Sequence, residues 1–96
     1  MSGIDVVAVL VAKPGHEAAL EAVLQACVAP SMAEPGCIFY RLNRDSAHAG
    51  RFVFLERWAD EEAIATHEAT SHFQALAAAL PEHLDGEALI MKLETR

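Results

Sequence analysis

The feature that most constrains the fold is an unbroken apolar stretch near the start of the chain. Residues 6–12 contain no polar side chain and are rich in β-branched residues. This pattern is typical of a strand that is buried on both faces. We therefore expect a strand over residues 4–12, ended by the turn-forming sequence Lys13-Pro14-Gly15.

A helical period follows this strand. From residue 16 to residue 32 the apolar side chains recur every three or four positions, which predicts a helix. Pro30 lies within this span, and we expect the helix to kink or tighten there because proline has no amide hydrogen. The sequence Glu34-Pro35-Gly36 then predicts a stop and a turn.

Two alternating segments come next, over residues 37–44 and 51–58, with a polar loop at 45–50. Both alternate as strands do, so every second side chain points to the same face. In the first strand these side chains are Ile38, Tyr40 and Leu42. In the second they are Phe52, Phe54, Glu56 and Trp58.

The last third of the chain predicts helices and a final strand. Asp60 is a plausible N-cap for a helix that carries Ile64 and His67 on one face. We expect a break at residues 70–71, a second helical segment over 73–80 ended by Pro81, and a strand over 88–94.

The resulting order is β-α-β-β-α-β, the ferredoxin-like split βαβ pattern. It predicts a single α+β domain over residues 1–96, with an antiparallel sheet and two helices on one face. The other face of the first strand is also apolar, and a bare apolar face should not meet water. We therefore expect a homodimer in which two sheets pack face to face as a shared barrel.

Composition excludes several classes of partner. The net charge is −7 and the seven basic residues are scattered, whereas binding to nucleic acid or to an anionic membrane needs a basic patch. The N-terminus lacks a signal-peptide pattern. Cys27 and Cys37 form no CxxC motif, which favours a reduced, cytoplasmic protein.

Glu56 is the most informative single residue, because strand alternation places its carboxyl group among aromatic side chains. A buried carboxyl group needs a partner or its pKa rises. It is a candidate general base or ligand anchor. The alternative is a structural carboxylate bonded to a backbone amide or to Arg41.

His67 and His72 are the second candidate pair. In one continuous helix they would point roughly 140° apart, but a break at residues 70–71 would let them converge as an acid–base or substrate-binding pair. The alternative is one capping and one partly exposed histidine. Glu56, His67 and His72 could form a two-histidine, one-carboxylate metal set, but nothing in their spacing demands it, and we expect no metal.

The remaining candidates are aromatic. Trp58 and Tyr40 could clamp a planar ligand, although both could equally be core. Cys37 has no adjacent basic residue and is interpreted as a packing residue. The chain has no GxGxxG or GxSxG sequence and no glycine-rich phosphate loop, so no bound nucleotide or flavin is expected.

Taken together, these motifs resemble the antibiotic biosynthesis monooxygenase domain family over nearly the full chain. The resemblance is carried by motifs that occur in order at the family's spacing: Ala12-Lys13-Pro14-Gly15, Glu34-Pro35-Gly36-Cys37 with Tyr40, Phe54-x-Glu56-x-Trp58, Ala63-x-x-x-His67, and Ser71-His72-Phe73. It implies a ferredoxin-like, dimeric α/β barrel with one cavity per subunit, between the sheet and the helices.

The resemblance also implies oxidation of a small quinol or polyphenol by O2 without metal or bound cofactor. His67 or His72 would be the base, with Glu56 as a further catalytic group. Tyr40, Phe54, Trp58 and Phe73 would hold the aromatic substrate.

At two positions this chain lacks a catalytic residue that some members of the family use. Some members use an asparagine from the sheet, whereas Asn43 here is out of phase with Tyr40. Haem-degrading relatives use a histidine one turn after the motif phenylalanine, where this chain has Ala77.

Two other functions stay open. One is a non-catalytic ligand-binding or stress-response module, and the other is an isomerase of a small phosphorylated metabolite using Arg41, Arg57 or Lys92.

Overall fold

The computed structural model describes residues 3–96 and has the expected α+β, ferredoxin-like topology. Its elements are β1 (Ile4–Val11), α1 (Glu17–Gln25), α2 (Val28–Met32), β2 (Cys37–Arg44), β3 (Arg51–Trp58), α3 (Glu61–Glu68), α4 (Ser71–His83) and β4 (Leu89–Leu93). The four strands form one antiparallel sheet in the order β2-β3-β1-β4. Each crossover contains two helical segments. The expected break at residues 70–71 separates α3 from α4, whereas the single helix predicted over residues 16–32 is divided into α1 and α2.

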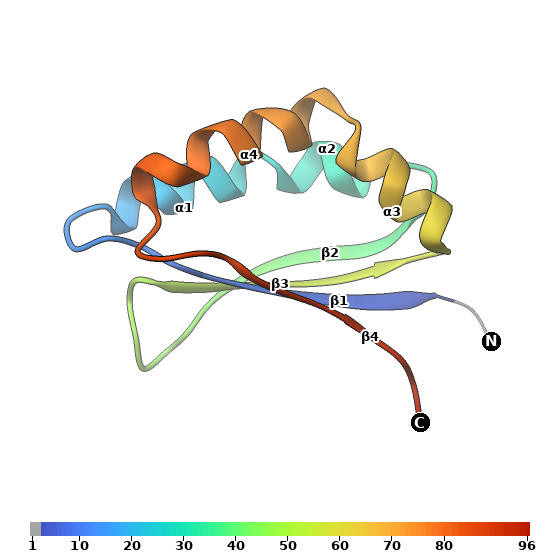
Figure 1. Cartoon of the computed structure of the whole chain (residues 1–96), viewed down its shortest axis with the longest axis horizontal. Helices are drawn as coiled ribbons and strands as arrows, with labels where there is room; N and C mark the ends of the chain where they lie inside the picture. The colour runs from blue at the N-terminus through green and yellow to red at the C-terminus, as the bar shows by residue number, and fades with distance from the viewer. Residues whose placement is uncertain (1–2) are drawn as a thin grey trace.

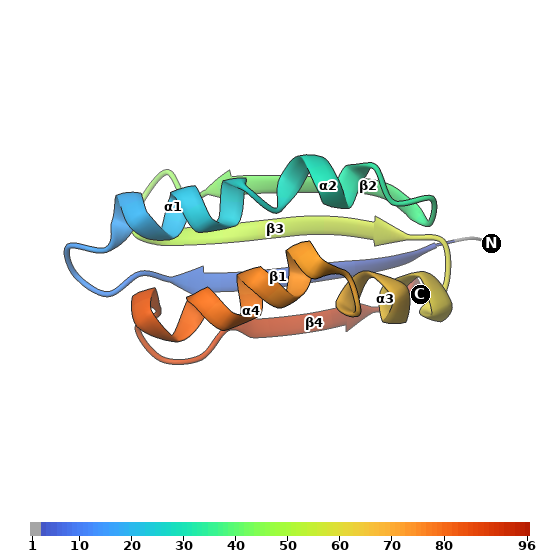
Figure 2. The same cartoon turned by 90° about the horizontal axis from the view of Figure 1, so that it is seen from above.

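All four helical segments cover the same face of the sheet (Figure 1). Seen from above, α1 and α2 run along β2 and β3, while α3 and α4 run along β1 and β4 (Figure 2). The opposite face carries no layer formed by residues 3–96, and we call it the open face. No helix within residues 3–96 has the length and hydropathy needed to cross a membrane.

The two faces of β1 differ in burial because only one is covered. Val6, Ala8 and Leu10 point to the helices and are buried, whereas the residues between them on the open face are only half-buried. The expectation of burial on both faces is therefore not met within one chain. Exposed Leu55, Leu89, Met91 and Leu93 extend this apolar open face across β3 and β4.

The register of β2 differs from simple alternation at its start. The pairing with β3 shifts between Cys37 and Phe39, so Ile38 is an extra residue and is 52% exposed. Tyr40 still points to the helices and is buried. The prediction that Ile38 shares its face was wrong, because a bulge changes the side-chain phase of the residues before it.

The two prolines act differently from the prediction. The first helix breaks at residues 26–27, one turn before Pro30, because Pro30 has no amide hydrogen to donate to Ala26. Pro30 then lies in the first turn of α2, where amide groups need no helical partner. Pro81 lies inside α4 and does not end it, since the helix continues to His83.

The turn before β2 packs closely against the start of α3. Ala59 donates its amide hydrogen to the Gly36 carbonyl at 2.8 Å. A Cβ atom at Gly36 would lie 2.4 Å from the Cβ of Ala63 in α3. Glycine is therefore needed here for close approach, and the packing brings the neighbouring Glu34 beside α3.

We expect Gly36→Ala to lower the free energy of unfolding by about 1–3 kcal/mol, the usual cost of overpacking. Urea unfolding followed by Trp58 fluorescence measures this change. Gly50→Ala is the matched control, because an added Cβ there meets its neighbours only at ordinary contact distances of 3.4 Å and beyond. Equal stability of the two variants would contradict this account of the turn.

Candidate functional site

A cavity of about 100 Å³ lies between the sheet and the pair α3–α4. Its walls are mostly apolar, and its polar groups gather at one end. The sheet contributes Val6, Ala8, Leu10, Tyr40, Phe54, Glu56, Trp58, Ala88, Ile90 and Lys92, and the helices contribute Ile64, His67, Glu68, Phe73, Leu76, Ala77 and Leu80. Of the predicted site residues, all except His72 line this cavity.

Glu56 and Trp58 form a hydrogen-bonded pair in the cavity wall. They are two residues apart on β3 and share the helix-facing side, and the Trp58 indole Nε1–H donates to Glu56 Oε1 at 2.9 Å. Burial raises the pKa of the Glu56 carboxyl group to about 7, and the charges of Glu34 and Glu68 act in the same direction. The Trp58 hydrogen bond opposes the rise. The Glu56 carboxyl group therefore changes between its protonated and ionised forms near neutral pH.

A break between α3 and α4 orients His67. Thr70 is the N-cap of α4: its hydroxyl accepts from the Phe73 amide at 3.2 Å and donates to the His67 carbonyl at 2.7 Å. The His67 ring lies among aromatic rings, with centroid distances of 4.4 Å to Trp58, 5.0 Å to Phe73 and 5.5 Å to Tyr40. The cap thus holds the backbone at His67, whose imidazole lies in the cavity wall.

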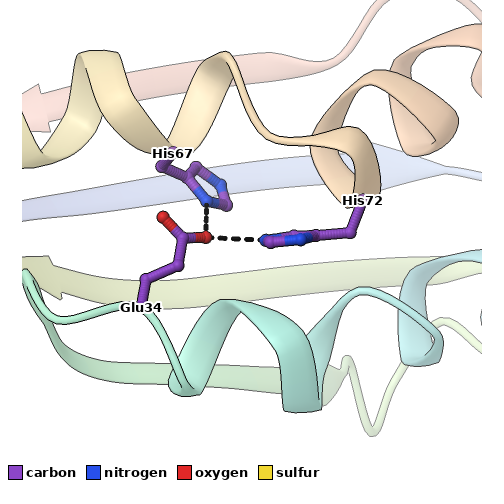
Figure 3. A group of neighbouring side chains, drawn as sticks. All are labelled: Glu34, His67 and His72. Carbon is purple, nitrogen blue, oxygen red and sulfur yellow. Dashed lines mark hydrogen bonds and ion pairs between the residues drawn. The ribbon is translucent and has the colours of Figure 1, made fainter.

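Glu34 joins His67 to His72 (Figure 3). Its Oε2 atom lies 2.7 Å from His67 Nδ1 and 2.7 Å from His72 Nε2. All three side chains are largely buried, with exposed fractions of 9% for Glu34, 5% for His67 and 20% for His72. Sequence reasoning missed Glu34, which was interpreted only as part of a turn.

The carboxylate determines which ring nitrogens carry hydrogen. An ionised carboxylate only accepts hydrogen bonds, so both nitrogens facing Glu34 must be donors. His67 then donates from Nδ1, and its Nε2 has no hydrogen-bond partner among the described residues. In the neutral imidazole this Nε2 carries the lone pair. Nε2 is therefore the nitrogen of His67 that is free to accept a proton.

His72 lies at a different surface from His67. It lines a groove of about 250 Å³ between α1 and α4, beside Cys27 and Leu76. The structure brings His72 close to His67, with ring centroids 5.9 Å apart, but separates it from the cavity. Of the two histidines, only His67 is placed to contact a ligand there.

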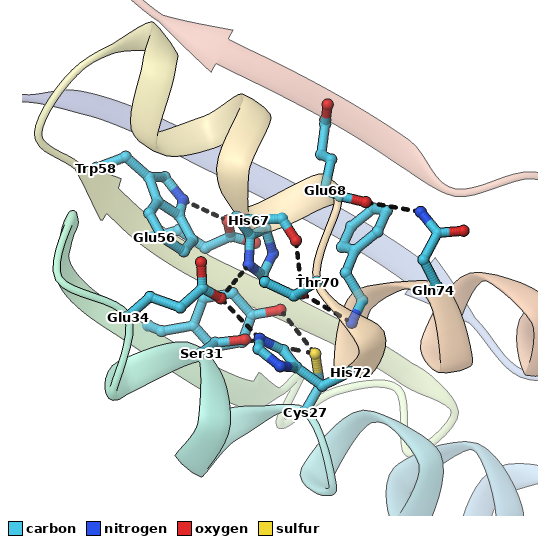
Figure 4. A network of polar contacts seen from close by, with 12 residues as sticks. Cys27, Ser31, Glu34, Glu56, Trp58, His67, Glu68, Thr70, His72 and Gln74 are labelled. Atoms are coloured by element: carbon cyan, nitrogen blue, oxygen red, sulfur yellow. Dashed lines mark hydrogen bonds and ion pairs between the residues drawn. The ribbon is translucent and has the colours of Figure 1, made fainter.

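Beside the histidines, Cys27 and Ser31 take part in a further set of buried polar contacts (Figure 4). The Tyr40 hydroxyl donates to Cys27 Sγ at 3.7 Å, and Cys27 lies 3.5 Å from the Ser31 hydroxyl. Burial, followed by the Glu56 charge, raises the pKa of Tyr40 well above its usual value. Burial likewise raises the pKa of the Cys37 thiol to about 11, so both residues stay protonated.

The departures noted in the sequence are also visible in the structure. Asn43 is exposed and its amide lies 3.4 Å from the Arg41 and Val53 carbonyls, away from the cavity. Ala77 lines the cavity and offers no ligand for haem iron. Arg57 pairs with Asp5 on the open face, and Lys92 pairs with Glu61 at 3.1 Å. Of these two basic side chains, Arg57 lies away from the cavity, whereas Lys92 contributes to the cavity wall and is paired with Glu61.

Comparison with known proteins gives consistent matches. Residues 4–79 match the family model described as antibiotic biosynthesis monooxygenase. A protein from Mycobacterium tuberculosis named "Putative monooxygenase" is 35% identical over 72 residues, which are 75% of this chain and 70% of that protein. An uncharacterised protein from Synechocystis is 32% identical over 72 residues, and this match spans about half of its length, 49%, and 75% of this chain.

Solved structures agree with the sequence matches. A crystal structure of a Pseudomonas aeruginosa protein superposes with a TM-score of 0.94 and 34% identity, covering 100% of this chain and 96% of that one. This agreement extends the likeness over β4 and the end of α4, which lie beyond the region matched by the family model.

Glu56 should make stability depend on pH. Because the folded protein holds its proton more tightly than the unfolded chain does, the free energy of unfolding should fall as pH rises from about 4.5 through about 7. The pKa shift corresponds to about 3 kcal/mol. Urea unfolding at several pH values should show this fall in the wild type and a much smaller one in Glu56→Gln. Parallel profiles for the two proteins would refute the assignment.

Proposed function

The chain belongs to the antibiotic biosynthesis monooxygenase family, and on that premise we propose that it oxidises a small quinol with O2 without a bound cofactor. The observation that carries this proposal is the His67 imidazole in the wall of an apolar cavity, with its Nδ1–H held by Glu34. A base of this kind suits chemistry in which the substrate itself supplies the electrons.

His67 would start the reaction by taking a phenolic proton at Nε2. The buried Glu34 carboxylate would stabilise the imidazolium that forms, as a charge-assisted hydrogen bond does. Glu56, whose pKa is raised to about 7, would bond the second hydroxyl group of the quinol. Trp58 and Phe73 would hold the ring beside the base, so that the phenolic hydroxyl group and His67 Nε2 are already oriented for proton transfer.

The reaction balances without an external reductant. Deprotonation makes the quinol ring electron-rich, and the ring transfers an electron to O2. Recombination of the two radicals places a hydroperoxide on a ring carbon. Loss of water then leaves one oxygen atom on the ring of a hydroxyquinone. All four electrons that reduce O2 come from the quinol.

Cavity size favours a substrate with one ring. The cavity measures about 100 Å³, and an engineered cavity of roughly 150 Å³ is known to accept benzene. A single substituted ring would fit after small side-chain movements, whereas a three-ring anthrone would need the helices to separate from the sheet. We therefore place simple hydroquinones and catechols ahead of anthrones.

We also propose that the protein is a homodimer joined through the open face. Exposed Leu89, Met91 and Leu93 make an apolar band on β4, and the half-buried valines of β1 continue it. Burying such a band against a second copy removes apolar surface from water. The two free cysteines fit a reduced compartment such as the cytoplasm.

Oxygen uptake with a panel of hydroquinones and catechols tests the oxidation. We expect uptake that resists chelator, and a loss of about 100-fold or more in His67→Ala, in line with the usual contribution of a positioned base. His48→Ala, on an exposed loop, is the matched control, and boiled protein measures autoxidation. Quenching of Trp58 fluorescence without uptake would instead support the non-catalytic binding module.

Light scattering after size exclusion tests the dimer. We expect twice the chain mass for the wild type at micromolar concentration and the single-chain mass for Leu89→Asp/Met91→Asp, since two buried carboxylates oppose association. Met32→Asp is the control, because Met32 is 58% exposed on α2, away from the open face. A wild-type protein that elutes as a monomer would exclude this assembly.

A further inference from the structure

We propose that Glu34, His67 and His72 form a binding site for a divalent transition-metal ion of the zinc class. One carboxylate and two imidazoles point toward one another from three segments of the chain (Figure 3). Each offers one donor atom, and these atoms all lie within 4.8 Å of one another. The proposal concerns an ion that binds beside the cavity, and it does not depend on the oxidation proposed above.

The donor geometry is close to that of a metal site. Glu34 Oε2 lies 2.7 Å from each of the two imidazole nitrogens. Zinc bonds of about 2.0 Å in a tetrahedron separate neighbouring ligand atoms by roughly 3.3 Å. Small rotations of the three side chains would open this space, and two imidazoles with one carboxylate select zinc-like ions over Mg²⁺ or Ca²⁺.

The buried negative charge around the cluster also favours binding of a cation. The Glu34 side chain is about nine-tenths buried, and its Oε1 atom has no hydrogen-bond partner among the described residues. The Glu34 charge helps to raise the pKa values of Glu56 and Cys37. No ion pair within residues 3–96 joins a lysine or arginine to Glu34 or Glu56. An ion would neutralise this buried negative charge, and it would also satisfy Oε1 if both oxygens of the carboxylate bind it.

An ion has a route to the cluster that avoids the cavity. His72 lines the groove between α1 and α4, and one-fifth of its side chain is exposed. Glu34 lines a second cleft near Ala59 and Asp60, on the other side of the cluster. The site is therefore reachable from solvent while His67 keeps its opposite edge toward the cavity.

Metal binding would change what His67 presents to the cavity. The ion would replace the hydrogen on Nδ1, so a neutral imidazole would carry its hydrogen on Nε2 and have no lone pair for a substrate. If the proposed oxidation is correct, zinc should inhibit it reversibly. This consequence alone rests on the proposed function.

Calorimetric titration of chelator-treated, dialysed protein with ZnCl2 tests the site. We expect one ion per chain in the wild type and affinity lower by at least about 10-fold in Glu34→Gln and in His72→Gln. MgCl2 should give no binding. Substitution with Co²⁺ adds a second readout, because its visible absorption reports the ligand geometry of the bound ion.

His83→Gln is the sharpest control. His16 and His83 place their Nδ1 atoms 3.0 Å apart, so this pair is the other location where two imidazoles could share an ion. Wild-type affinity in His83→Gln with loss in His72→Gln supports the proposal. Undiminished zinc binding in both Glu34→Gln and His72→Gln, loss only in His83→Gln, or no binding in the wild type overturns it.

Circular dichroism checks that each variant is folded. His72 is partly exposed, so His72→Gln remains informative if Glu34→Gln fails to fold. The calorimetry needs no substrate. A protein that binds zinc as expected but consumes no O2 would refute the oxidation and leave the metal site standing, whereas chelator-resistant O2 uptake without zinc binding would do the reverse.

Discussion

The structure depends most on one buried carboxylate. Glu34 lies in the turn between α2 and β2, yet its Oε2 atom contacts side chains from both α3 and α4. This single oxygen ties the first crossover to the second and fixes the orientation of the imidazole in the cavity wall. Gly36 makes the arrangement possible, because only a residue without a side chain lets the turn approach Ala63 so closely.

The sheet could be predicted from the sequence because its signals are local. Period-two alternation correctly placed Phe52, Phe54, Glu56 and Trp58 on one face, and the order of periodic segments was enough to identify the ferredoxin-like topology. Alternation failed only at Ile38, where a bulge inserts an extra residue. A bulge depends on how two strands pair, and the sequence of β2 or β3 alone does not determine the register between them.

The site could be predicted only in part, for a related reason. The resemblance to the family implied that Tyr40, Trp58 and Phe73 line the cavity, and all three lie in its wall. Glu34 carried no such signal. It is 33 residues from His67 and 38 from His72, and its neighbours Pro35 and Gly36 are sufficient to explain a turn. Its contacts arise from tertiary packing, which periodicity does not encode.

The cavity is bounded on one side by the edge of the sheet. Ala88, Ile90 and Lys92 contribute to its wall, and β4 is hydrogen-bonded to β1 on one side only, with all five of its residues exposed. An edge strand opens locally at a lower free energy than a central one. Any molecule that fills the cavity and contacts Ile90 will therefore slow amide exchange along β4, so ligand occupancy and fraying of this strand are thermodynamically linked.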